Sequence, residues 1–225
     1  MAGIRLDLHV HSHHSPDSSL SVETIVTALA ARGLNGFALT DHNLTAGHVE
    51  LAEWRAKAPN FILVPGVEVS TLEGHLLLYG VRESPPTGRP VAETIDWARD
   101  HGSVPVLAHP FRFSHGVGRT IAEGAAVPAI ETVNGHNSPR ANRRAAVVAA
   151  ARNLATTGGS DVHQLSDLGR AYTEFPEGTS SVDGVLEALR SGRTLAGGQC
   201  LDFAARFRTQ WRTVGLRFRR GLRPI

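Results

Sequence analysis

The chain has 225 residues, of which 41% are hydrophobic and 20% charged, and its net charge is +2. This length is enough for one domain with a large core, and the composition is too apolar for a disordered chain. Its single cysteine, Cys200, excludes a disulfide framework and a cysteine zinc site, so any metal must be held by imidazole and carboxylate groups. The sequence has no apolar run long enough to span a bilayer and no signal pattern at its start, and we expect a cytoplasmic protein.

The hydrophobic pattern predicts strands that alternate with helices. The expected strands are residues 4–10, 36–40, 61–69, 75–79, 104–109, 129–133 and 154–157, with a short one at 193–197. The expected helices are residues 22–32, 45–57, 91–101, 139–153 and 182–190. About seven such units favour a distorted, TIM-barrel-like (β/α)7 barrel over an open sheet. No Gly-x-Gly-x-x-Gly follows the first strand, which argues against a dinucleotide-binding domain.

The first predicted strand carries two histidines, His9 and His11, one residue apart. Strand side chains repeat every two residues, so these two and Asp7 share a polar face, opposite an apolar one. A strand with this polar face is more typical of a metal site than of a core.

Similar polar residues lie at or just past the ends of four other predicted strands. They are Asp41 and His42, Glu68, His109, and Asp161 and His163. In β/α barrels this is the face where active sites lie, so we expect one pocket there. Imidazoles and carboxylates suit zinc, manganese or iron, and carboxylates such as Glu68 and Asp161 can bridge two ions. The pattern therefore favours metal-assisted hydrolysis.

Five motifs, in order along the chain, carry a resemblance to a known family. They are Asp7-Leu8-His9-Val10-His11-Ser12, Thr40-Asp41-His42-Asn43, Gly66-Val67-Glu68-Val69-Ser70, Ala108-His109-Pro110 and Gly159-Ser160-Asp161-Val162-His163. Over residues 4 to about 175 the chain resembles the PHP (polymerase and histidinol phosphatase) phosphoesterases. The resemblance implies a distorted seven-stranded barrel, here residues 1–200, that holds two or three Mn, Zn or Fe ions.

The resemblance also implies which residues bind these ions. The first ion would be held by His9, His11, Glu68 and Asp161. The second would be held by Glu68, His109 and His75, and the third by His42, His163 and a residue of the first loop. For that loop residue we choose Asp17, with His13 and His14 as alternatives. Glu68, Asp161 and His163 are the expected catalytic residues.

Other polar residues have supporting roles. Arg112, Arg140 and Arg143 are our candidates for binding a phosphate, although arginines at the start of a helix, Arg144 among them, more often form a solvated face. Glu131, Asn134 and Asp7 are expected to hydrogen-bond the ligands. His48, His101 and His115 are expected to be surface or helix-end histidines.

Residues 201–225 form a basic tail with seven arginines and one acid. Its apolar residues recur every three or four positions: Phe203, Phe207, Trp211, Val214, Phe218 and Leu222. The arginines fill most of the remaining circumference: Arg206, Arg208, Arg212, Arg217, Arg219, Arg220 and Arg223. This pattern predicts a basic amphipathic helix. Three interpretations stay open: a helix packed on the barrel through its aromatics, a segment bound to an anionic membrane surface, or an arm that binds nucleic acid.

We therefore expect a metal-dependent phosphoesterase in which metal-bound hydroxide attacks a phosphomonoester or a nucleotide or short oligonucleotide end. Only about 50 residues separate His109 from Asp161, so the small inserted domain that nucleotide-directed relatives often carry is not expected, and the site should be open. A metal-dependent amidohydrolase-like enzyme is one alternative. A non-enzymatic metal-binding module, localised to a membrane surface by its tail, is the other.

Overall fold

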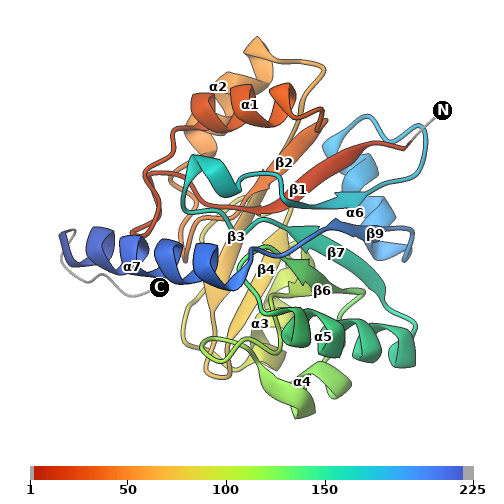
Figure 1. Ribbon diagram of the computed structural model, residues 1–225. Helices are drawn as coiled ribbons and strands as arrows, with labels where there is room; N and C mark the ends of the chain where they lie inside the picture. Colours follow the sequence, from red (N-terminus) through yellow and green to blue (C-terminus); the bar gives the residue numbers. More distant parts are fainter. Residues whose placement is uncertain (1–2, 220–225) are drawn as a thin grey trace.

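One sheet runs through the molecule and curls until its first and seventh strands meet (Figure 1). The computed structural model describes residues 3–219. The strands are β1 (Arg5–Val10), β2 (Gly36–Leu39), β3 (Ile62–Ser70), β4 (His75–Tyr79), β5 (Val104–Leu107), β6 (Ala129–Asn134), β7 (Ala155–Gly159), β8 (Ala171–Glu174) and β9 (Leu195–Gly198). Their order in the sheet is β7-β6-β5-β4-β3-β2-β1-β8-β9.

The contact between β1 and β7 makes the sheet a nearly closed barrel. The Asp161 N–H, just after β7, donates to the His9 carbonyl at 2.7 Å, and Val10 and Val162 form a parallel bridge. Gly159 allows this approach, because a Cβ there would lie 2.3 Å from the His9 Cβ. The expected barrel-like fold is confirmed, but the described sheet has nine strands and not seven. β4 runs antiparallel to both β3 and β5, and β8 and β9 add an antiparallel edge beside β1.

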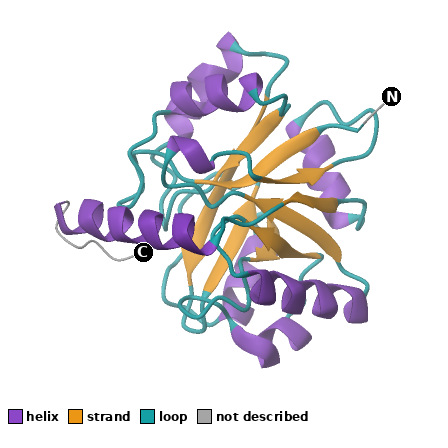
Figure 2. Ribbon diagram, viewed as in Figure 1, coloured by secondary structure: helices purple, strands orange, loops and turns teal. Residues whose placement is uncertain are grey.

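Helices surround this sheet, most of them on its outer side (Figure 2). They are α1 (Val22–Ala31), α2 (His48–Lys57), α3 (Val91–Asp100), α4 (Gly118–Gly124), α5 (Pro139–Arg152), α6 (Val182–Arg190) and α7 (Phe203–Arg219). Local signals fix their ends: the Ser21 and Ser138 hydroxyls accept hydrogen bonds from the first turns of α1 and α5, and Asn153 ends α5 in the left-handed conformation. The short elements α4 and β8 were not predicted, because neither has a hydrophobic repeat long enough to detect.

Apolar side chains form an inner cluster and two outer clusters. The inner one fills the barrel with residues from seven strands, including Leu6, Leu8 and Val106, and α6 packs against it. The outer clusters join the sheet to α1 and α2 on one side, and to α3, α4 and α5 on the other. The inner cluster leaves the carboxyl ends of the strands for polar residues, so the site has a rigid base.

Helix α7 crosses the face of the barrel at these strand ends and continues through Gly215 without a break (Figure 1). Residues 220–225, with Arg220, Leu222 and Arg223 of the expected stripe and its arginines, lie outside the described part of the chain. None of the helices in residues 3–219 has the length and apolar character that a membrane span requires.

The Gly159 contact yields a stability test. Gly159→Ala is expected to lower the free energy of unfolding by about 2 kcal/mol or more, because the added methyl group forces β1 and β7 apart. Urea unfolding measures this loss. Gly124→Ala, at the end of α4 where a Cβ meets no atom within 4 Å, is the matched control and should be neutral or slightly stabilising. Equal stability of the two variants would contradict the closure we describe.

Candidate metal centre

Side chains from five separate strand ends meet at the barrel face beneath α7. His9, His11, His42, Glu68, His109 and Asp161 are all buried there. A cavity of about 830 Å³ opens onto this group and is lined by Asp17, His42, Glu68, His75, Asp161 and His163 among others. The nine residues that the sequence suggested as metal ligands thus lie together, although they span residues 9 to 163.

Two irregularities in strand pairing deliver several of these side chains. The register of β1 against β2 shifts between Asp7 and Val10. Leu6 and Leu8 therefore point into the barrel, whereas Val10 packs outward against α1 and α2. Strict alternation would have put His9 and His11 on the face opposite Leu8, so the shift is what turns them inward. The register of β6 also shifts, between Glu131 and Val133.

Two other site residues have backbone conformations that are unusual for residues with side chains. His109 has φ 26° and Asp161 has φ 54°, both in the left-handed region. Such conformations cost about 1–3 kcal/mol each and persist where the surroundings fix them, often at functional sites. Here they turn the chain at the ends of β5 and β7, so that both side chains enter the same pocket.

The first proposed ligand group has the spacing of a metal site. The Glu68 Oε2 atom lies 3.1 Å from His9 Nε2 and 3.2 Å from His11 Nε2. The Asp161 Oδ1 atom lies 3.6 Å and 3.3 Å from the same two nitrogens. A tetrahedral ion about 2.1 Å from each ligand atom would place those atoms about 3.4 Å apart. The four atoms thus have room for one ion between them.

Buried polar atoms without hydrogen bonds mark the same group. Among the described residues, His9 Nε2, His11 Nε2 and Glu68 Oε2 are buried and have no partner in hydrogen-bonding geometry. Such atoms are rare in folded proteins because leaving them unpaired costs about 1–3 kcal/mol each. A bound cation would satisfy all three atoms at once. The donor set of two imidazoles and two carboxylates therefore fits a divalent ion.

The other oxygen of Glu68 faces a second pair of imidazoles. Its Oε1 atom lies 2.8 Å from His75 Nδ1 and 2.8 Å from His109 Nε2. His42 Nδ1 lies 3.2 Å from Oε2 on the other side. A carboxylate with imidazoles at both oxygens has the arrangement of a bridge between two ions.

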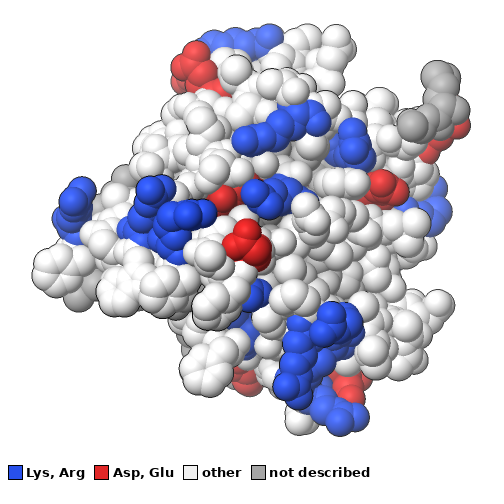
Figure 3. Space-filling model, viewed as in Figure 1, with Lys and Arg blue, Asp and Glu red and all other residues white. Residues whose placement is uncertain are grey.

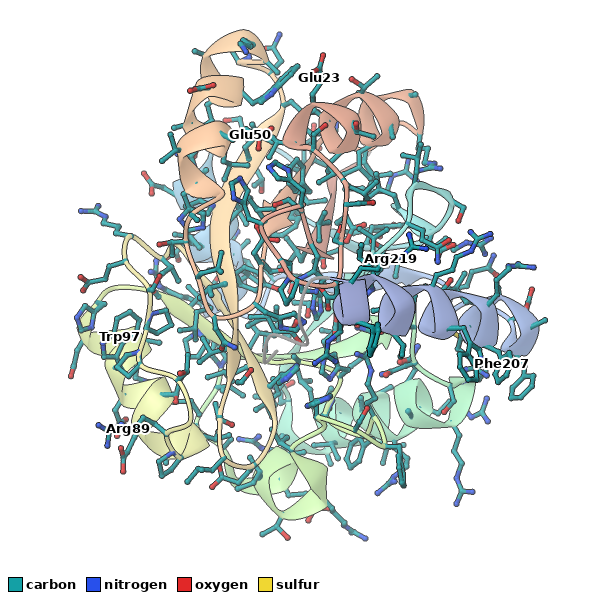
Figure 4. The ribbon with its side chains drawn as sticks, turned by 90° about the vertical axis from the view of Figure 1, so that its left-hand side faces the viewer. Glu23, Glu50, Arg89, Trp97, Phe207 and Arg219 are labelled. Atoms are coloured by element: carbon teal, nitrogen blue, oxygen red, sulfur yellow. The ribbon has the colours of Figure 1, made fainter. Side chains whose placement is uncertain are left out.

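Asp17 connects the remaining two histidines. Its Oδ2 atom lies 3.1 Å from His42 Nε2 and 3.0 Å from His163 Nε2. His13 and His14, the other candidates for this position, instead group with Glu50 of α2 (labelled in Figure 4), on the partly exposed side of the loop. Of the three loop candidates, Asp17 alone is in contact with both histidines of the third group.

The electrostatics keep the carboxylates ionised. Burial alone would raise the pKa of Glu68, but His9, His42 and His75 hold it well below its usual range. Arg112 and His9 act in the same way on the pKa of Asp161, against the effect of burial. Burial lowers the pKa of His11, yet Asp161 and Glu68 raise it overall to about 10. Protons on such histidines compete with a metal ion, so binding an ion must release them.

A second set of side chains holds the ligands in place. The Glu131 Oε1 atom lies 3.0 Å from His9 Nδ1, which leaves Nε2 facing the cavity. The Asn134 amide donates to Glu131 Oε2 at 3.0 Å and to Asp161 Oδ2 at 3.1 Å. Asp7 accepts hydrogen bonds from the Ser160 N–H and hydroxyl, and so ties β1 to the loop after β7. The expected supporting positions of these three residues agree with these contacts.

The candidate phosphate-binding arginines separate into two groups. Arg112 lines the cavity, where its guanidinium donates to Asp161, to Asn134 Oδ1 at 2.7 Å and to Asn137 Oδ1 at 3.1 Å. Arg140 and Arg143 are exposed on α5 and do not line it. Arg144 of the same helix does, with its guanidinium 4.3 Å from the centre of the Phe111 ring.

One histidine at the site, His136, was not among the candidates predicted from the sequence. His136 lines the cavity at 5.3 Å from the His163 ring, and burial, followed by His163, lowers its pKa to about 3. It follows β6 directly, so the rule that polar residues after strands form the site could have found it. His115 is exposed, as expected, and it also borders the cavity, where its ring stacks on that of His75 with the ring centres 4.6 Å apart.

The family comparison gives two matches. A family model described as "PHP domain" matches residues 7–95, and one described as "PHP-associated" matches residues 139–194. An uncharacterized protein of Methanocaldococcus jannaschii is 29% identical over 118 residues, which are 48% of this chain and 68% of that protein. A 5'-3' exoribonuclease of Haemophilus influenzae is 43% identical over 67 residues, which are 30% of this chain and 24% of the exoribonuclease.

Several solved structures share the fold. PsfC from Pseudomonas syringae has a TM-score of 0.71 and 19% identity, covering 97% of this chain and 99% of its own. A protein from Bifidobacterium adolescentis that has been assigned as a metal-dependent phosphoesterase has a TM-score of 0.61 and 18% identity, covering 89% and 98%. A lesion-specific endonuclease from Pyrococcus furiosus has a TM-score of 0.63 and 18% identity, covering 84% of this chain and 56% of the endonuclease.

The contacts of Asn134 predict a change in metal affinity. Asn134→Ala is expected to weaken Mn²⁺ binding by about 10–100-fold, because Asp161 and Glu131 lose the amide that orients them. Titration calorimetry measures the affinity. Asn35→Ala, which removes a hydrogen bond to the Arg5 N–H at the far end of β1, is the control and should leave the affinity unchanged. Unchanged affinity in both variants would show that Asn134 does not position the ligands.

Proposed function

This chain belongs to the PHP family, and on this premise we propose that it is a phosphoesterase. Its substrate would be a phosphomonoester, or the end of a nucleotide or short oligonucleotide. The family match and the His/Glu/Asp cluster support a metal-dependent hydrolase. The observation that carries the proposal is the group of buried, unpaired ligand atoms on His9, His11 and Glu68.

The proposed ligands form three groups around Glu68. The first ion would be held by His9, His11, Glu68 and Asp161. The second would be held by Glu68, His75 and His109, and the third by Asp17, His42 and His163. Manganese, zinc or iron would suit these donors. Bound ions of this kind supply an activated water at neutral pH and neutralise charge that develops on a phosphoryl group.

The chain's own contribution would be to bind and orient the phosphate. Arg112 is fixed at the cavity wall by two asparagines and Asp161, so its guanidinium is already oriented before a ligand arrives. Arg144 adds a second positive charge on the same wall. We propose that these two arginines bind the substrate phosphate and that His163, in the cavity beside Asp17, positions the leaving group. Glu68 and Asp161 keep their catalytic role through the ions they hold.

The choice of substrate class rests on the cavity and on the relatives. The cavity is open and has Phe111 and Phe113 in its wall, so a flat ring could stack beside the arginines. The Haemophilus protein is named a 5'-3' exoribonuclease, and a solved structure of endonuclease Q holds a DNA duplex with an abasic lesion. Both names favour a phosphate ester of a nucleotide or nucleic acid.

The alternative, an amidohydrolase-like reaction at a carbonyl centre, would use the same ligands. A fold neighbour from Chromobacterium violaceum, with a TM-score of 0.63 and 22% identity, is named an amidohydrolase and was solved with bound sulfate and no metal. Dependence on the two cavity arginines separates the reactions, because an uncharged amide gives a guanidinium little to bind.

Metal removal tests the proposed activity. The protein loaded with Mn²⁺ is expected to hydrolyse p-nitrophenyl phosphate or a member of a nucleotide panel, and chelation with EDTA should abolish this. His9→Ala should lower kcat by about a thousandfold or more with the fold retained, because it removes a ligand of the first ion. Circular dichroism checks the fold. An enzyme that turns over no phosphoester with any of the three metals would refute the proposal.

A second test compares arginines on one helix. Arg144→Ala is expected to raise KM by about tenfold with a smaller change in kcat, since it removes a cation from the cavity wall. Arg143→Ala removes an exposed arginine of α5 outside the cavity and should change neither constant. Steady-state kinetics on the best substrate measure both. A larger rise in KM for Arg143→Ala than for Arg144→Ala would mean that the phosphate binds outside this cavity.

A further inference from the structure

Helix α7 has an apolar face that the barrel does not cover. Phe203, Phe207, Trp211, Val214 and Phe218 are between 50% and 77% exposed. At 100° per residue these five form one continuous stripe along the helix. Phe207 projects beyond the ribbon of α7 in Figure 4, where Arg219 marks the other end of the helix. The aromatics therefore do not pack on the barrel, which was one of the three interpretations of the tail.

The remaining sides of α7, away from the stripe, hold the helix in place. Ala205 and Thr209 are buried, and the Thr209 hydroxyl donates to Asp167 Oδ2 at 3.0 Å. Arg206 donates to the Asn137 carbonyl at 2.8 Å and Arg212 to Gln164 Oε1 at 2.7 Å. These contacts direct the aromatic stripe outward.

Arginines flank the stripe on both sides. On one side Arg206 and Arg217 border the cavity, and on the other Arg208 and Arg219 are exposed. The sequence from Phe203 to Arg219 contains no acidic residue. Figure 3 shows the result: a band of positive side chains beside a band of uncharged ones where α7 lies. An outward apolar face between cationic flanks is the arrangement of a helix that lies in a membrane interface.

We propose that α7 docks this protein on an anionic lipid surface, with the aromatic stripe between the lipid headgroups and the arginines on their phosphates. The charge pattern decides among three partners that could cover the stripe: a second copy of this chain, a nucleic acid and an anionic bilayer. A second copy of the helix, packed stripe to stripe, would bring two sets of arginines together. Nucleic acid would pair with the arginines but would leave the five apolar side chains in water. An anionic bilayer satisfies both features at once.

This docking would orient the metal centre. Phe203, Phe207 and Val214 of the stripe also line the cavity, so the cavity mouth lies beside the docking face. A bound protein would therefore hold its cavity next to the lipid surface. The docking does not depend on which reaction the centre performs, and its test requires no turnover.

Flotation of the full chain with vesicles tests the proposal. The protein should float with vesicles of mixed phosphatidylcholine and phosphatidylglycerol, not with pure phosphatidylcholine, and high salt should reduce the bound fraction. Trp211→Ser with Phe218→Ser should lower the partition coefficient by at least about tenfold, because two exposed aromatics are lost. Neither side chain lines the cavity, so activity on a soluble substrate and the melting temperature should stay unchanged.

The matched control removes apolar side chains elsewhere. Val49→Ser with Val147→Ser changes two exposed valines on α2 and α5 and should leave flotation unaffected. Arg208→Glu should weaken binding to anionic vesicles by reversing one flanking charge. No flotation with anionic vesicles, or flotation unchanged in the Trp211/Phe218 variant, would overturn the proposal. Two other outcomes would also overturn it: formation of a dimer, or binding to single-stranded DNA, observed in place of vesicle binding and lost in the Trp211/Phe218 variant.

Discussion

The burial of the Glu68 carboxylate is the constraint on which the rest of the centre depends. An ion taken out of water costs several kcal/mol unless other groups replace its hydration. Five histidines surround this carboxylate, from four strands or the loops after them: His9, His11, His42, His75 and His109. The last two are within hydrogen-bonding distance of its Oε1 atom. Without Glu68 these imidazoles would lose the one carboxylate that all five contact, and without them Glu68 could not stay buried and ionised. The sheet must therefore curl far enough to bring all of them around one side chain.

Departures from regular strand geometry complete this arrangement. A regular strand sends alternate residues to opposite sides, so it can place at most every second residue at a barrel site. The register shifts in β1 and β6, and the left-handed residues His109 and Asp161, re-aim side chains that regular strands would send elsewhere. Asp7 and Asn134 then fix these segments through hydrogen bonds to neighbouring loops. The strain is local, and the apolar cluster beneath it supports the whole group.

Much of this could be predicted from the sequence. The alternation of strands and helices gave the barrel, and the position of polar residues after strands gave the ligand candidates. The sequence pattern failed where the geometry departs from a period: it assigned His9 and His11 to a simple strand face and did not reveal the shift that turns them inward. It also missed His136, although this residue lies just after β6, and polar residues just after the other strands supply the candidates. The outward face of α7 could not be predicted, since an amphipathic pattern does not say which face the protein covers.

The meeting of β1 and β7 has a consequence for how the chain reaches its native state. The residues that close the barrel, such as His9 and Asp161, are about 150 positions apart, so their contact is among the most non-local in the molecule. Contacts of this kind form late, because the chain must first lose the entropy of a long loop. Until then His9 and His11 stand on a strand whose acidic partners are not yet in place. A divalent ion held by His9, His11 and Asp161 would need both strands in place, so it would slow unfolding by holding the first and seventh strands together.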